Sequence, residues 1–150
     1  MMNEASKSLP DAIPTTDTVD AAKRERDPHC GPVSEVAWSA DAEARKRGRV
    51  EIFNATRPDG RDKWTMDIRQ YDLMREHILC MIDGFAGDDG TIRLSEVVTA
   101  AQDQFGTHEL FPKGRVRNYC TFTKVDMEAR CEIERVPGKS PQRIRRWVND

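Results

Sequence analysis

The pattern of apolar and polar residues predicts a series of short helices and strands after the first thirty residues. The clearest helix begins at Asp67, which is followed three residues later by Gln70 as in a capping box, and is preceded by Met66, which can pack on Tyr71. Apolar side chains recur at helical spacing on its inner face, at Tyr71, Met74, Ile78, Ile82 and Phe85. We therefore expect a helix that ends close to Gly84.

Two more amphipathic stretches follow. Ser95 is a candidate N-cap for a helix that ends at Gly106, with Val98, Ala101 and Phe105 on its buried face. After Gly114 a third helix is predicted, and its apolar face is formed by Val116, Tyr119, Cys120, Thr123 and Met127.

Extended segments are predicted around these helices. Residues 50–54 and 63–66 alternate as strands around a turn at 58–60, and residues 91–93 form a very short extended piece. Past Arg130 the period changes to that of a hairpin, with strands in 131–136 and 142–148. A short helix from Ser34, its N-cap, to a stop at Gly48 has a thin apolar face.

The order helix, short strand, helix, helix, hairpin indicates a mainly α fold with a small β hairpin, of the α+β class, built around one core. We expect this domain to span residues 50–150. Residues 1–49 are expected to form a disordered or weakly helical tail, because the first thirty or so lack helical and strand periodicity and contain no Phe, Trp or Tyr.

Composition excludes several classes of protein. The 150 residues are 33% charged and 37% hydrophobic, with no apolar run of about 18 residues and no signal-peptide core at the N-terminus, so we expect a cytoplasmic protein without a membrane partner. The four cysteines contain no Cys-x-x-Cys pair, and the three histidines have no useful metal spacing. We therefore expect no metal, no cofactor and no enzymatic activity.

The net charge of -2 conceals an uneven distribution of charge. Residues 111–150 contain ten Lys and Arg against five Asp and Glu, a net of +5, whereas residues 1–110 have a net of -7. A local excess of positive charge can attract a polyanion even when the whole protein is nearly neutral.

The same C-terminal region resembles a winged helix-turn-helix. The run Met127 to Gly138 looks like the end of a recognition helix that leads into a wing, and Leu110 to Arg146 is similar to a family of uncharacterised prokaryotic winged-helix proteins. Two departures are visible. Cys131 stands where the common pattern has Gly, so we expect the helix to end by a geometry other than the left-handed stop. The connection in 107–114 is also longer than the turn of a tight helix-turn-helix.

The resemblance implies binding of double-stranded DNA, as in a transcriptional regulator. On the third helix, Asn118, Thr121, Phe122 and Val125 are expected to face the major groove opposite the core, with Arg115, Arg117 and Lys124 on phosphates beside them. The wing would add further cations for the DNA backbone or minor groove, namely Lys139, Arg143, Arg145 and Arg146.

A different class of function is also open at this point. An exposed Phe122 beside Val125 is equally typical of a winged-helix module that binds proteins and not DNA. A homodimer is compatible with both functions, and the Trp38 helix or the strand in 50–53 are candidates for the dimer contact.

Overall fold

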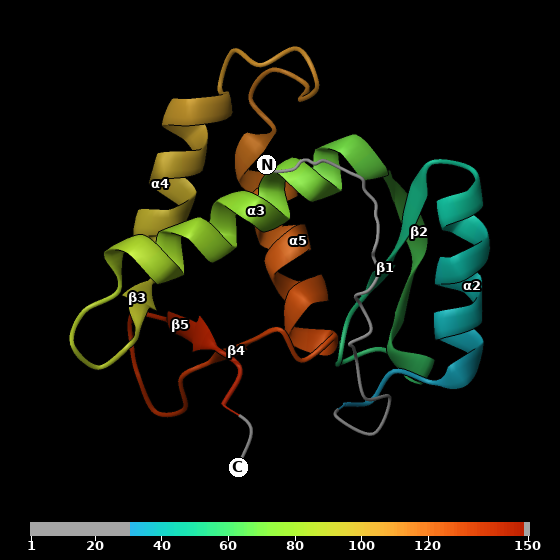
Figure 1. The fold of residues 1–150 in the computed structure, drawn as a ribbon, viewed down its shortest axis with the longest axis horizontal. Coiled ribbons are helices and arrows are strands. Elements are labelled where there is room, and N and C mark those ends of the chain that lie inside the picture. Colours follow the sequence, from blue (N-terminus) through green and yellow to red (C-terminus); the bar gives the residue numbers. More distant parts are fainter. Residues whose placement is uncertain (1–30, 149–150) are drawn as a thin grey trace. The chain divides into compact units, whose positions relative to one another are not determined.

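The computed structural model describes residues 31–148, and over that range the chain forms four α-helices, five strands and one short 3₁₀ turn (Figure 1). In chain order they are α2 (Glu35–Lys46), β1 (Arg49–Phe53), η2 (Pro58–Gly60), β2 (Arg61–Asp67), α3 (Ile68–Phe85), β3 (Ile92–Arg93), α4 (Leu94–Phe105), α5 (Val116–Ala129), β4 (Ile133–Arg135) and β5 (Arg143–Arg146). The α+β class is therefore confirmed.

Helix α2 belongs to the folded unit. The Ser34 hydroxyl accepts a hydrogen bond from the amide of Ala37 at 3.1 Å, as its N-cap role predicted, and Gly48 just past the helix has a φ of 76°. Ala37 packs with Phe53 of β1, and the compact unit begins at Pro32. The boundary placed at residue 50 was therefore too late, because a thin apolar face is enough when a strand covers it. The rest of the expected tail, 1–30, lies outside the described residues.

Strands β1 and β2 form an antiparallel hairpin that packs against α5. Within residues 31–148 no third strand pairs with the outer edge of β1, and two of its amides donate to carboxylates instead. The amide of Glu51 donates to Asp41 at 3.0 Å, and the amide of Phe53 donates to Asp126 at 2.8 Å. Since Asp126 lies on α5, this second bond fixes the hairpin to that helix.

The main core lies among α3, α4, α5 and the second sheet. As predicted, Tyr71, Met74, Ile78 and Ile82 on α3 are buried. Phe85 was expected to continue this face, but 69% of its surface is exposed. It lies at the last position of α3, where no neighbouring element covers it.

Two predicted helix starts differ in detail. Asp67 is the N-cap of α3, but it accepts from the amide of Arg69, and the side chain of Gln70 donates instead to the carbonyl of Leu110. Helix α4 begins at Leu94, so Ser95 is not its N-cap. The amide of Leu94 donates to the carbonyl of Gln142 beside β5, so the helix starts directly where β3 ends.

The second sheet is antiparallel, with the spatial order β3-β5-β4. Ile92 of β3 lies opposite Ile144 of β5, and Ile133 of β4 lies opposite Arg146. These three isoleucines are buried against the helices, whereas Arg146 is exposed. The predicted hairpin after Arg130 is confirmed. The short extended piece predicted before α4 is β3, the third strand of the sheet that contains this hairpin.

Helix α5 ends with a non-glycine residue in the left-handed region. Cys131 has a φ of 62°, and its amide donates to the carbonyl of Glu128 while the amide of Glu132 donates to that of Met127. These two bonds form a Schellman motif. The expectation of another geometry was wrong, because the two bonds to orphan carbonyls offset the cost of about 1 kcal/mol for a side chain in this conformation.

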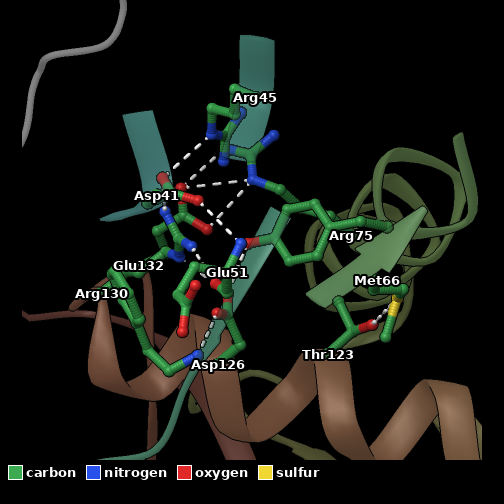
Figure 2. Close-up of polar contacts among 11 residues, drawn as sticks. Asp41, Arg45, Glu51, Met66, Arg75, Thr123, Asp126, Arg130 and Glu132 are labelled. Carbon is green, nitrogen blue, oxygen red and sulfur yellow. Dashed lines mark hydrogen bonds and ion pairs between the residues drawn. The ribbon is translucent and has the colours of Figure 1, made fainter. Parts of the chain in front are cut away.

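A buried ion network joins α2, β1 and α5 (Figure 2). Arg130 donates through Nε to Asp126 at 2.8 Å, through Nη1 to Asp41 at 3.0 Å and through Nη2 to the carbonyl of Glu51 at 2.9 Å. The hydroxyl of Tyr71 donates to Asp126 at 2.5 Å. Each of the three guanidinium nitrogens thus donates a hydrogen bond inside the protein.

Burial alone raises the pKa of Asp41, but the charges of Arg130 and Arg45 outweigh burial and hold this pKa below its usual value. Burial raises the pKa of Tyr71 well above its usual value, so the phenol stays protonated as a donor. The guanidinium of Arg130 also lies 4.1 Å from the centre of the Phe53 ring. The network is saturated with internal partners and fixes the orientation of α5.

Candidate nucleic-acid interface

A narrow strip of α5 remains accessible after the rest of the helix is covered. Arg117 is exposed, and Thr121 and Val125, one and two turns further on, are half-buried, as is the neighbouring Asn118. Val116, Cys120 and Met127 on the opposite side are buried in the core. Three residues predicted to lie on this face, and one predicted to flank it, are therefore brought together on one side of the helix.

Phe122 borders this strip on the side of the β1–β2 hairpin. It is 39% exposed, and its ring meets that of Trp64 of β2 at 5.2 Å and an interplanar angle of 75°. This edge-to-face contact covers part of the apolar surface of Phe122. Phe122 thus has a partner within the chain as well as an accessible edge.

Lys124 was expected beside the exposed face as a phosphate contact, but it is buried, with 6% of its surface exposed. Its ammonium forms an ion pair with Glu128 at 2.9 Å and a short hydrogen bond with the side chain of Gln142. Because Gln142 precedes β5, Lys124 ties the hairpin to α5. In this arrangement its ammonium is occupied within the protein.

The predicted wing cations fall into two groups. Arg145 pairs with Glu134 at 2.7 Å, and Arg146 pairs with Asp83 of α3 at 2.6 Å. Arg143 donates to the hydroxyl of Thr91, a neutral partner, at 2.7 Å. Lys139 is exposed in the hairpin turn. Thus Lys139 and Arg143 form no ion pair with a described carboxylate, whereas Arg145 and Arg146 each form one. Hydrogen bonds from Thr91 and, to a smaller extent, the charge of Arg143 lower the pKa of Asp89.

Further cations lie at the amino end of α5. Arg115 and Arg117 are exposed and form no ion pair with a described carboxylate, and the same holds for Lys113 before them. The helix has no side-chain N-cap, so the positive end of its dipole lies beside these three cations. Sequence analysis missed Lys113 and also Arg135, an exposed cation of β4. Ile133 and Arg135 are two residues apart and share one face of an ideal strand, so strand alternation gave no signal for the exposure of Arg135.

Thr121 was expected to face the major groove, and its hydroxyl donates within α5 to the carbonyl of Asn118 at 3.0 Å. The oxygen of such a hydroxyl can still accept a second hydrogen bond. Asn118 carries its side-chain amide beside Arg117, with no side-chain partner among the described residues.

The part of the chain from residue 31 to residue 148 contains no group of three or more His, Cys, Asp or Glu side chains placed to hold a metal ion. It also contains no helix with the length and apolar character needed to cross a membrane.

Comparison with known proteins gives one match. Residues 49–144 match the family DUF6958, which is described as a family of unknown function. No curated protein and no solved structure shows significant similarity to the chain.

Proposed function

The chain belongs to the DUF6958 family, and we propose that it binds double-stranded DNA through α5 and the β4–β5 hairpin as a winged helix-turn-helix protein, in the role of a transcriptional regulator. The observation that carries this proposal is the combination of element order and sheet order. A strand, β3, lies between α3 and α4, α5 follows, and β5 then pairs between β3 and β4. This is the arrangement in which a winged helix presents its last helix and its hairpin on one side.

Charge supports the same assignment. Six cations that form no ion pair with a described carboxylate lie around the two ends of α5. They are Lys113, Arg115 and Arg117 at its amino end, the last of these in the first turn of the helix, and Arg135, Lys139 and Arg143 beyond its carboxyl end. The 14 residues of α5 span about 21 Å, so the two groups can reach phosphates on either side of a groove about 12 Å wide.

The mechanism has two parts. Phosphate contacts by the flanking cations and by the amino end of α5 capture the duplex and set its register, without reading sequence. Base readout then falls to Asn118, whose amide can pair with adenine in two hydrogen bonds, and to Val125, whose methyl groups can meet a thymine methyl.

Fluorescence anisotropy of a labelled random duplex at about 50 and 200 mM salt tests the proposal. Six phosphate contacts predict a slope of log K against log salt of about -5, which is roughly a 10³-fold loss of affinity over this range. Failure to bind at 50 mM salt contradicts the proposal.

A double substitution locates the contact. Arg115→Ala with Arg117→Ala should weaken binding and make the slope less steep by about 2, because two phosphate contacts are lost. The matched control is Lys46→Ala with Arg47→Ala, which removes two charges from the end of α2. If both double variants weaken binding equally, the effect comes from net charge and the assignment to α5 is wrong.

The alternative function, a module that binds proteins through Phe122 and Val125, receives less support. Phe122 has an aromatic partner within the chain, and the neighbouring exposed side chains are cationic. An intact protein that fails to bind DNA at low salt would favour this alternative.

A further inference from the structure

An apolar stripe runs along α3 at the margin of the core, with Leu73 packed against the core and His77 buried beside the carbonyl of Val97. Leu73, His77, Cys80 and Gly84 follow one another at spacings of four, three and four residues, which places them on one line along the helix. Cys80 and Gly84 are exposed and Leu73 is half-buried. Phe85 extends the stripe and is, at 69%, the most exposed of the large hydrophobic residues described.

Next to this stripe the surface is hollowed. A pocket of about 310 Å³ lies between α3 and α4, and its walls include Leu73, Glu76, His77, Met81 and Phe105. Phe85 also lines it, although most of its ring is in solvent. One surface therefore carries both a projecting aromatic side chain and a cavity of a size that a phenyl ring can enter.

Gly84 has no role within the chain that explains it. It lies inside a helix, where Gly is unfavourable relative to Ala, and its backbone is not in the left-handed region. A methyl group added at this position would meet nothing within 4 Å. A glycine there leaves the surface of α3 open to close approach by another molecule.

We propose that this face of α3 is a homodimer interface, in which a second copy of the chain packs its own α3 in antiparallel orientation across a two-fold axis between His77 and Cys80. In that register Leu73 of each copy lies opposite Gly84 of the other. Phe85 of each copy then reaches the hollow beside Leu73 and His77 of the other. An isologous contact needs a self-complementary surface, and this one contains both halves of the contact.

Charge favours the antiparallel orientation. Arg69, which pairs with Asp67 at 2.8 Å, is exposed at the first turn of α3, and Asp88 is exposed just past its end. Antiparallel packing places Arg69 of one copy beside Asp88 of the other, and it also opposes the two helix dipoles. Parallel packing would bring like charges together at both ends. A small ligand in the hollow would leave the outer part of Phe85 in water, whereas a second copy covers it.

The predicted dimer contacts on the Trp38 helix and on the strand in 50–53 include side chains that pack within the protomer. Trp38 packs edge-on against Phe53 at 5.0 Å, and Val50, Ile52 and Phe53 are buried within the protomer. The α3 interface does not depend on DNA binding, because it lies on a different element from the α5 strip.

Sedimentation velocity of the full chain over a range of concentrations, without DNA, tests this inference. We expect a reversible dimer, and we expect Phe85→Gln to raise its dissociation constant by at least about 10-fold, as for an aromatic side chain at the centre of an interface. The matched control is Val36→Gln, at a residue of α2 that is 64% exposed. This control should leave the dissociation constant unchanged.

Two results would overturn the proposal. One is a monomer at all concentrations up to about 100 µM, which excludes an interface of useful strength. The other is a dimer whose dissociation constant is unaffected by Phe85→Gln, or is raised equally by Val36→Gln. A second readout is crosslinking with a short bis-maleimide, which should yield a covalent dimer that is lost in Cys80→Ser and reduced in Phe85→Gln.

Discussion

At the scale of single residues, Arg130 does most to hold the amino-terminal layer on the rest of the protein. Its guanidinium joins Asp41 of α2, Asp126 of α5 and the backbone of β1, and it is stacked on Phe53. A buried cation of this kind is tolerated because it is paired with two carboxylates and each of its nitrogens donates a hydrogen bond. Removal of one partner leaves charge uncompensated, and the cost is then larger than the value of the ion pair itself.

Asp41→Asn should therefore lower the free energy of unfolding by about 3 kcal/mol at pH 7. Urea unfolding of the variant and of wild type measures this loss. The control is Glu43→Gln, in an exposed ion pair with Lys46, which should change stability by less than about 0.5 kcal/mol. Equal effects of the two substitutions would show that the buried network has no special role.

The same variant tests the pH dependence. The pKa of Asp41 is lower in the folded protein than its usual value of 3.8, so its stabilisation is complete above pH 3.8 and is lost as pH falls through the folded pKa. The difference in the free energy of unfolding between wild type and Asp41→Asn should thus become smaller below about pH 4. A difference in the free energy of unfolding that stays constant from pH 7 to pH 3 would contradict the lowered pKa of Asp41.

At the scale of elements, helical periodicity was sufficient to place α3, α4 and α5, and alternation placed the two hairpins. The errors concern residues whose partners are distant in sequence. The predicted N-cap at Ser95 was wrong because β3 pairs with β5, and α4 begins directly after β3 at Leu94. Lys124 lies on a face that a helical wheel assigns to solvent, but Gln142 and Glu128 bind its ammonium.

The candidate site, like the elements, could be predicted only in part from the sequence. The strip formed by Arg117, Asn118, Thr121 and Val125 follows from the period of α5 alone. The period does not show which cations form ion pairs. Arg145 and Arg146 meet their carboxylates only after the hairpin folds back on β4 and α3. A sum of charges over residues 111–150 contains no information on this pairing.

Lys124→Met tests the revised role of this residue at the element scale. The substitution keeps an apolar stem and removes the ammonium, so Glu128 and Gln142 lose a partner, and we expect the free energy of unfolding to fall by about 1 to 2 kcal/mol. The salt slope of DNA binding should stay that of wild type. A stable variant with a less steep salt slope would mean that Lys124 contacts phosphate after all.

At the scale of the whole molecule, different functions are assigned to different faces. The α5 strip and the β4–β5 hairpin carry the proposed DNA contact, the α3 stripe carries the proposed dimer contact, and the β1–β2 hairpin with α2 covers the remaining side of α5. The nearly neutral net charge of -2 is compatible with DNA binding, since the field that a duplex meets is set by the cations near α5.

The most direct test of the central claim is a titration of ¹⁵N-labelled protein with a short duplex at low salt, followed by the amide shifts of each residue. We predict the largest changes at 113–125 and 135–143, with α2 and the α3–α4 hollow unaffected. Changes centred on α2 or on the α3 stripe, with none at the amino end of α5, would contradict the assignment of α5 and the hairpin as the DNA-binding face.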